Sequence, residues 1–332
     1  MTTYALMKNP NHTRVSFQDS DTLAIKELTA MSSLISAKNI RLKEIGGIQY
    51  VLFDSDQALV EHALCVTSRL SFVYAIFEMS GEMLMPITPM PNYFLGSDLS
   101  TILKYTGKTN ELFTRFMLNI AQTYIKTPVE NLNILDPLAG KGTTLYEALM
   151  QGYNAYGVEI DAKLAHESVV YLKKYLETAK YKHANHTERV SGQLSHGKFT
   201  ATRSQIKFTE SGRQFEIVEG DTRNTSAYFK KNFFHGIIAD MPYGVQHGSK
   251  SSKKPQGATI TRNALGLITE AMPGWVKVLK PGGVIVLAWN LFLISKAEMV
   301  ELLEGHGFAV PELDFAHRVD QAIDREFIVG VK

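Results

Sequence analysis

From residue 112 onward the chain alternates short apolar runs with segments of helical spacing, and this alternation constrains the fold more than any other feature. The strand-length runs are residues 133–135, 155–158, 215–218, 236–239 and 283–289. Strands that alternate with helices predict a parallel sheet covered on both faces, because parallel strands need crossover connections. Residues 308–315 and 326–331 are predicted to close this sheet as a pair of strands.

The first 95 residues predict a small α+β unit instead. The expected elements are helices over residues 22–35 and 58–66, and strands over residues 48–53 and 71–78. This alternation is typical of a ferredoxin-like half-module. Residues 85–96 contain three prolines and are predicted to be a linker. We therefore expect two domains, an N-terminal α+β domain over residues 1–95 and an α/β domain over residues 96–332.

Composition limits the class of protein. The single cysteine, Cys65, excludes an internal disulfide and a thiolate-cluster metal site. No apolar run approaches the roughly 20 residues of a membrane span, and residues 1–12 lack the apolar core of a signal peptide. We expect a cytoplasmic protein with no membrane partner. The net charge is only +2, so a binding site for a polyanion has to come from local basic patches.

The segment after the first parallel strand carries the most informative pattern. The strand ends at Asp136, a turn with Gly140 and Gly142 follows, and a helix then begins with Thr143 or Thr144 available as its cap. Glycine lets the backbone approach a ligand where a Cβ atom would block it. Ligands of open parallel sheets bind beyond the carboxyl ends of the strands. We therefore expect a ligand site at this turn.

Three ligands compete for the turn. A phosphate loop needs glycine at position 135 and a hydroxyl residue at position 142, where this chain has Leu135 and Gly142. A dinucleotide fingerprint needs a third glycine at position 145, where this chain has Leu145. Residues 136–142 satisfy in full the pattern Asp-x-x-x-Gly-x-Gly of adenosyl-methionine sites. That ligand has a cationic amino group and a sulfonium, so a carboxylate such as Asp136 suits it. A tight turn with no ligand is the alternative.

Acidic residues follow the next two strands. Glu159 lies about 20 residues past the glycines, where a carboxylate can accept both ribose hydroxyls of a nucleoside. Asp221 follows the third strand and can accept the adenine amino group. Capping of a following helix is the other role for such residues. We favour that role for the neighbouring Asp161 and leave both roles open for Asp221.

The end of the fourth strand predicts the chemistry. Residues 239–244 read Ala-Asp-Met-Pro-Tyr-Gly. An exocyclic amine of a base is a poor nucleophile, because its lone pair is delocalised into the ring, so it has to be held in line with a methyl donor. Asp240 can accept one N–H, and the carbonyl beside Pro242 can accept the other. Tyr243 offers a face for base stacking, worth on the order of 1–3 kcal/mol; an ordinary strand-to-loop turn is the alternative.

Together these motifs resemble the class I adenosyl-methionine-dependent methyltransferases over roughly residues 106–332. The resemblance implies an α/β fold with a Rossmann-like, seven-stranded sheet whose last strand is antiparallel. It also implies S-adenosyl-L-methionine as the cofactor. The implied cofactor-binding residues are Asp136, Gly140, Gly142, Thr143, Glu159 and Asp221, and the implied catalytic residues are Asp240, Pro242 and Tyr243.

A narrower resemblance concerns the substrate. Asp-x-Pro-Tyr-Gly at residues 240–244 resembles the motif of RNA guanine-N2 methyltransferases that carry a THUMP domain, whereas adenine-N6 enzymes usually have Asn first. Residues 105–112 and 68–78 resemble further stretches of that group and of related tRNA enzymes. The roughly 100 residues before the catalytic domain are too few to hold both this N-terminal region and a full THUMP domain, so we expect no full THUMP domain.

Two basic segments are candidate RNA contacts. Residues 173–213 hold nine Lys or Arg against three Glu, and residues 245–262 hold four with no acid. We expect both as loops, the first longer than an ordinary helix-to-strand connection. Cationic loops beside a base pocket suit a phosphate backbone, with ordinary solvated surface as the alternative. His183 and His186 lack a nearby third ligand, so we expect no metal.

The predicted function is methylation of the exocyclic N2 amine of a guanosine in RNA, with tRNA as the leading substrate. Two alternatives remain: an adenine or cytosine amino-methyltransferase acting on DNA or RNA, and a non-catalytic RNA-binding protein that keeps the fold. The replaced third glycine, Leu145, disfavours a nicotinamide-dependent oxidoreductase.

Overall fold

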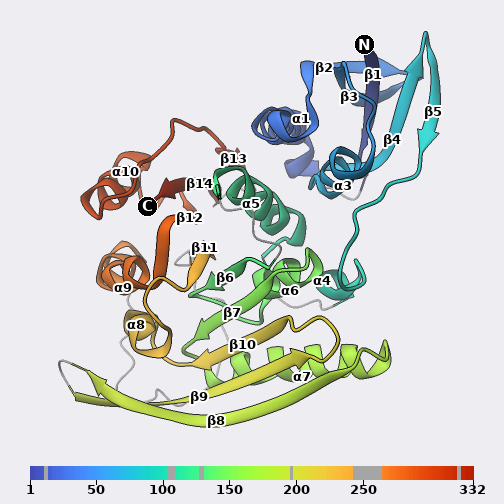
Figure 1. Ribbon diagram of the computed structural model, residues 1–332. Helices are drawn as coiled ribbons and strands as arrows, with labels where there is room; N and C mark the ends of the chain where they lie inside the picture. The colour runs from blue at the N-terminus through green and yellow to red at the C-terminus, as the bar shows by residue number, and fades with distance from the viewer. Residues whose placement is uncertain (11–13, 103–108, 127–130, 195–196, 242–263, 320–322) are drawn as a thin grey trace.

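The chain forms two β-sheets with their helices, seen in the computed structural model of residues 1–332 (Figure 1). The structure describes residues 1–10, 14–102, 109–126, 131–194, 197–241, 264–319 and 323–332. The smaller sheet comes from the N-terminal part of the chain, and the larger one from the remainder. Within the described residues, no helix combines the length and the hydropathy needed to cross a membrane.

The N-terminal sheet is antiparallel throughout. Its strands are β1 (Thr2–Lys8), β2 (Lys38–Ile45), β3 (Ile48–Ser55), β4 (Val73–Ser80) and β5 (Met83–Ile87), in the order β2-β3-β1-β4-β5. The helices between them are α1 (Arg14–Ala30), α2 (Ser32–Ile35) and α3 (Glu61–Arg69). Without β5, this element order and strand order are those of a ferredoxin-like split βαβ unit.

Alternate residues of the central strands build the N-terminal core. Tyr4 and Leu6 of β1 and Val51 and Phe53 of β3 are buried against Leu28 and its neighbours on α1, α2 and α3. Successive strand residues point to opposite faces, so this period of two buries one face of the sheet under the helices.

Three details of the N-terminal prediction are wrong. The first strand, β1, occupies the centre of the sheet, although the sequence analysis assigned it no structure. The predicted helix over residues 22–35 begins earlier, at Arg14, and is divided between α1 and α2 after Ala30. The first part of the predicted linker belongs to β5, which pairs with β4 as an edge strand.

Within the residues that the structure describes, the larger sheet has nine strands. They are β6 (Asn133–Asp136), β7 (Asn154–Glu159), β8 (His183–Leu194), β9 (Gly197–Phe208), β10 (Gln214–Glu219), β11 (Phe234–Asp240), β12 (Leu279–Asn290), β13 (His317–Arg318) and β14 (Asp324–Val331). Their order is β13-β14-β12-β11-β6-β7-β10-β9-β8. The five central strands, from β12 to β10, are parallel, so their carboxyl ends lie along one edge.

Helices cover both faces of this sheet, as predicted for an α/β fold (Figure 1). One core contains residues from α4 (Leu99–Ile102), α5 (Glu111–Tyr124), α6 (Thr143–Met150) and α7 (Ala162–Thr178). The core on the opposite face contains residues from α8 (Thr225–Tyr228), α9 (Ala264–Val278) and α10 (Lys296–Gly305). The antiparallel β14 beside β12 agrees with the methyltransferase resemblance.

The closing strands differ from the prediction. Residues 308–315 form no strand apart from a single bridge between Ala309 and Val331, and β13 begins only at His317. The aromatic side chains explain the difference. The ring of Phe315 stacks on Phe327 with centroids 4.3 Å apart, so residues that resemble a strand in hydropathy pack onto β14 as an irregular segment.

The basic segment 173–213 is not a loop. It contains the end of α7 and a hairpin in which β8 and β9 pair over their whole length. The second hairpin strand pairs with β10, so the hairpin adds two strands to the seven that the resemblance implied. We call this hairpin, residues 183–208, the ribbon.

The two sheets are joined where α1 meets α5. Glu27 of α1 is 1 % exposed and accepts hydrogen bonds from the Asn119 amide of α5 at 2.7 Å and from the Ser71 hydroxyl at 2.5 Å. Burial raises the pKa of Glu27, while the bonds from Ser71 and Asn119 lower it. An ion pair between Lys26 and Asp314, 2.9 Å long, lies at the periphery of the same joint.

Candidate active site at the carboxyl edge of the large sheet

The glycine turn begins where β6 ends. Asp136 is 3 % exposed, and its Oδ1 accepts the Leu138 amide at 2.9 Å while the Thr144 side chain donates to the same carboxylate. Gly140 and Gly142 have φ angles of +52° and +90°, a conformation that favours glycine. The predicted threonine cap is wrong, because Gly142 occupies the N-cap position of α6 and no side chain caps the helix. The hydroxyl of Thr144 serves Asp136 instead.

Glu159 ends β7 and faces the same turn. Its Oε2 accepts the Gly140 amide at 2.7 Å, and its Oε1 accepts the Asp161 amide at 2.8 Å. Burial raises the pKa of this carboxyl. The structure thus brings Gly140 and Glu159 together, although 19 positions separate them in sequence. Asp161 takes the capping role, with its Oδ1 accepting the Lys163 amide at the start of α7.

Asp221 also adopts a capping role here. It follows β10, and its Oδ1 accepts the Arg223 amide at 2.9 Å at the start of a 3₁₀ turn (Thr222–Asn224). Its Oδ2 also accepts from the Arg223 Nε at 2.9 Å, and that guanidinium reaches Glu270 of α9 at 3.0 Å. Asp221 therefore lies at the predicted edge of the sheet, held by a cation of its own chain.

Asp240 is the last residue of β11. The hydroxyl of Thr109, just before α5, donates to Asp240 Oδ2 at 2.8 Å. The following residue, Met241, continues the sheet by donating its amide to the Ala288 carbonyl of β12 at 2.8 Å. Pro242 and Tyr243 of the predicted catalytic turn lie outside the described residues, as does the second basic segment, 245–262.

Electrostatics show that three of these carboxylates share one neighbourhood. Burial, together with the nearby charges of Asp240 and Glu159, raises the pKa of Asp136 to about 7, although hydrogen bonds from Thr144 and Leu138 lower it. The hydrogen-bond donors to Asp136 and Glu159 are backbone amides and one hydroxyl, all neutral. Each nearby negative charge makes it harder for the Asp136 carboxyl to ionise. The cluster is therefore suited to a cationic ligand, which would relieve the repulsion.

The space over the turn also fits S-adenosyl-L-methionine. A Cβ atom at Gly140 would meet no atom within 4 Å, so the backbone there faces open space beside Glu159. The carboxylate of Asp136 matches the ligand's ammonium and sulfonium, and Glu159 matches its ribose hydroxyls. Thr143 lies in the first turn of α6, adjoining the same glycines.

Two hydroxyl residues of this site, Thr109 and Thr144, could not be identified as site residues from the sequence. Thr109 lies within residues 105–112, whose resemblance to RNA methyltransferases was noted, but no pattern indicated its contact with Asp240. Thr144 was considered only as a helix cap. Both donate to carboxylates of the cluster, Thr109 to Asp240 and Thr144 to Asp136, so each helps to orient one carboxylate without adding a charge.

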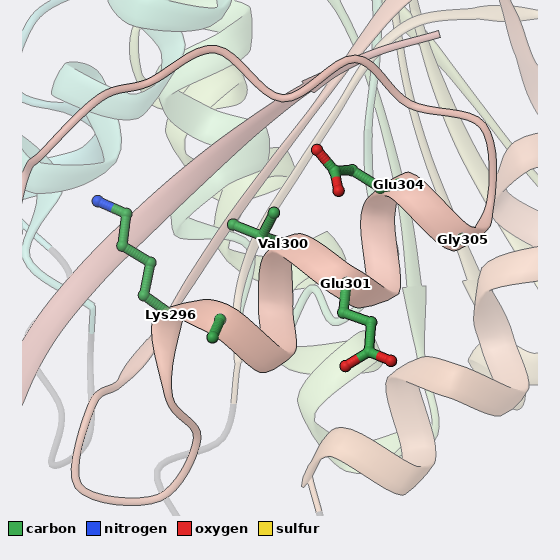
Figure 2. A pocket seen from close by; sticks show the side chains of 6 residues that line it. Lys296, Val300, Glu301, Glu304 and Gly305 are labelled. Atoms are coloured by element: carbon green, nitrogen blue, oxygen red, sulfur yellow. The ribbon is translucent and has the colours of Figure 1, made fainter.

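A shallow depression lies along α10, away from these strand ends (Figure 2). Its volume is about 680 Å³, and its lining residues are Lys296, Ala297, Val300, Glu301, Glu304 and Gly305. Lys296 is engaged with the Leu313 carbonyl and with Glu326. None of the predicted site residues lines this depression. In the described part of the chain, no group of three or more His, Cys, Asp or Glu is arranged to hold a metal.

Comparison with known proteins identifies the class. The chain belongs to the RMKL-like methyltransferase domain family, whose sequence profile matches residues 105–274. It is a class I methyltransferase, and its cofactor is S-adenosyl-L-methionine. The match includes the glycine turn, Glu159, Asp221 and Asp240. No curated protein matches the chain in sequence.

Solved structures with a similar fold include three methyltransferases. A TehB-like enzyme from Corynebacterium glutamicum has 13% identity and a TM-score of 0.35, covering 61% of this chain and 82% of its own. A Methanosarcina mazei enzyme has 14% identity and a TM-score of 0.40, with 64% and 96% covered. The Burkholderia thailandensis 1,6-didemethyltoxoflavin-N1-methyltransferase, solved with S-adenosylhomocysteine, has 12% identity and a TM-score of 0.40, with 67% and 79% covered.

Proposed function

We propose that this methyltransferase acts on RNA and methylates the exocyclic N2 amine of a guanosine, with a tRNA as its substrate. The observation that carries the proposal is Asp240, which ends β11 within electrostatic reach of Asp136 and is followed in sequence by Met-Pro-Tyr-Gly. The Asp in first position and the Gly in last resemble the RNA guanine-N2 enzymes rather than the adenine-N6 enzymes, which usually have Asn first.

The chemistry of the amine explains why a carboxylate is needed. When bound, the cofactor supplies a methyl group on a positively charged sulfur. Asp240 accepts an N–H of the guanine amine, so that the nitrogen lone pair turns toward the methyl carbon. The same carboxylate stabilises the positive charge that the nitrogen gains until it loses a proton. Holding both reactants in line supplies roughly 7–11 kcal/mol of barrier reduction, so no strong base is required.

Thr109 supports this role. Its hydroxyl bond of 2.8 Å fixes the Asp240 carboxylate without adding a cation that would compete for the negative charge. On this proposal Pro242 holds a backbone carbonyl toward the second N–H, and Tyr243 stacks on the base. Asp136, Glu159 and Asp221, with the Gly140–Gly142 backbone and Thr143, hold the cofactor.

For the organisation of the whole chain, we propose a catalytic domain over residues 96–332 and an RNA-binding domain over residues 1–95. The N-terminal sheet supports this division, because it has a core of its own built from β1, β3, β4 and three helices. The proposed compartment is the cytoplasm, where RNA and the cofactor are both present.

Mass spectrometry of nucleosides tests the function. RNA pools are incubated with the protein and methyl-labelled cofactor, then digested, and the label is expected in N2-methylguanosine. Asp240→Ala and Asp240→Asn are expected to lose on the order of 10²–10³-fold in rate while still binding the cofactor. Label in N6-methyladenosine would instead show that the target base is adenine. Tight RNA binding without any transfer would contradict the proposed catalysis.

A further inference from the structure

The ribbon extends beyond the edge of the sheet that carries the site. Its strand β9 pairs with β10 only from Lys207 to Thr202, the partner of Glu219 at the carboxyl end of β10. The remaining pairs, from Val190 with Ala201 to Leu194 with Gly197, continue past that end. Figure 1 shows this overhang projecting on the side to which β6, β7 and β10 point. The overhanging pairs therefore lie beyond the strand ends that carry Glu159 and Asp221.

The two faces of the ribbon differ in chemistry along the overhang and the pairs next to it. Directly paired residues of an antiparallel ribbon lie on the same face. One face carries the pairs Arg189 with Thr202, Ser191 with Thr200, and Gln193 with Lys198, and we call it the open face. All six residues are exposed or half-buried, and all are polar. Across the sheet, Arg189 pairs with Thr202 of β9, and Thr202 pairs with Glu219 of β10, which is the nearest acid on this face.

The opposite face is packed and neutralised. Ala201 is buried, and the Phe199 ring lies against the Tyr228 ring of α8 with centroids 5.3 Å apart. Arg203 on this face pairs with Glu188 at 3.3 Å and with Glu216 at 2.9 Å. By contrast, neither cation of the open face, Arg189 or Lys198, forms an ion pair with any residue that the structure describes. On the packed face the cation Arg203 is therefore paired with acids, whereas the two cations of the open face form no ion pair within the described residues.

From this separation we propose that the open face binds the phosphate backbone of the RNA substrate, next to the nucleotide held at Asp240. The inference rests on the proposed function, because it takes RNA as the substrate. Hydroxyl and amide side chains with Arg and Lys are the groups that contact phosphates, and two uncompensated cations on an otherwise neutral face complement a polyanion. The packed opposite face gives these groups a rigid support.

The test compares two charge-matched double variants. Arg189→Gln with Lys198→Gln removes the two cations of the open face. Lys230→Gln with Lys231→Gln removes two exposed lysines that precede β11, at the opposite edge of the sheet. RNA affinity is measured by fluorescence anisotropy at several salt concentrations, and the affinity for S-adenosyl-L-methionine by calorimetry. Thr200→Glu and Thr200→Lys test the sign of the charge effect on the open face.

We expect the ribbon variant to bind RNA about tenfold more weakly, with the salt slope reduced by about 1.5, because two phosphate contacts are lost. Cofactor affinity and the control variant should match the wild type. Thr200→Glu should weaken RNA binding, and Thr200→Lys should strengthen it. Equal RNA affinity of the ribbon variant and the control overturns the inference. RNA binding through the ribbon without N2-methylguanosine formation overturns the proposed function and leaves the inference standing.

Discussion

Two of the buried carboxylates in the large domain, Glu147 and Asp136, have opposite surroundings. Glu147 of α6 is fully buried, and the Arg115 guanidinium of α5 reaches it at 3.0 Å while Ser100 donates a further hydrogen bond. Burial lowers the pKa of Arg115, but the charge of Glu147 and its hydrogen bond raise it above its ordinary value, so the guanidinium stays charged. Asp136, only 11 positions before Glu147, has neutral donors and carboxylate neighbours.

The difference distinguishes a buried charge that stabilises the fold from one that can interact with a ligand. At Glu147 the chain supplies the counter-ion itself, and the pair joins α5 to α6. At Asp136 the chain leaves the carboxylate with a raised pKa, so a cationic ligand gains by entering. A desolvated carboxylate held near like charges is costly, and such groups concentrate at functional sites. If Asp136 holds the cofactor as proposed, binding is favoured because a cationic ligand relieves the repulsion among these carboxylates.

The largest expected effect breaks the structural pair. Arg115→Ala leaves Glu147 buried without its cation, so the free energy of unfolding should fall by about 3–5 kcal/mol. Chemical denaturation measures this loss. Arg115→Ala with Glu147→Gln should recover part of it, because the second change removes the stranded charge. A loss below about 1 kcal/mol for the single variant would show that Glu147 does not depend on its partner.

Asp136→Asn is expected to act with the opposite sign on stability. The amide can still accept from Leu138 and donate to Thr144, but the buried charge is gone, so the cofactor-free protein should unfold at a higher denaturant concentration at pH 8. Cofactor affinity should fall about 30-fold, because a charge-assisted bond worth roughly 2 kcal/mol is lost. Calorimetry measures the affinity. A variant that is destabilised and still binds the cofactor normally would contradict the functional assignment.

The pH dependence sharpens the same contrast. Because the pKa of Asp136 in the empty site is about 7, its carboxylate becomes charged as the pH rises through 7. Cofactor affinity should therefore rise about eightfold between pH 6 and pH 7.5, following the ionised fraction. By the same linkage, the folded state without cofactor loses stability as the pH rises toward 7, because the unfolded chain ionises this group near pH 4. Asp136→Asn should abolish the rise in affinity.

The smallest effect concerns the neutral donor to Asp240. Thr109→Val removes the 2.8 Å hydrogen bond and should lower kcat about fivefold, equivalent to about 1 kcal/mol. The KM for the cofactor should not change, because Thr109 acts only by orienting the Asp240 carboxylate. Thr109→Ser retains the hydroxyl and should restore most of the rate. An equal loss in both variants would point to packing rather than to the hydrogen bond.

The sequence predicted the parallel sheet and the turn because their signals are local. Strands with buried faces give continuous apolar runs, and Asp136, Glu159 and Asp240 each directly follow such a run. In a parallel sheet these ends meet at one edge whatever the intervening lengths. The electrostatic link between Asp136 and Asp240 agrees with that argument.

The remaining features depend on contacts that no local pattern encodes. The bond between Thr109 and Asp240 joins residues 131 positions apart, and no local pattern distinguishes Thr109 from the nearby Thr106. The ribbon was missed because its strands alternate polar residues with only a few apolar ones, Val190 and Phe199 among them, and its lysines and histidines resembled a solvated loop. Edge strands with one open polar face give weak hydropathy signals.

The joint at Glu27 has a mechanical consequence. The amide of Asn119 bridges Glu27 and the Arg69 carbonyl, at 2.7 and 3.0 Å, and Asn119 lies on the same helix, α5, whose first turn adjoins Thr109. Moving the smaller sheet away from α5 would remove the Asn119 donor from the buried carboxylate of Glu27. We therefore expect the N-terminal sheet and α5 to keep a fixed arrangement, so that the proposed RNA-binding domain stays at a constant distance from Asp240.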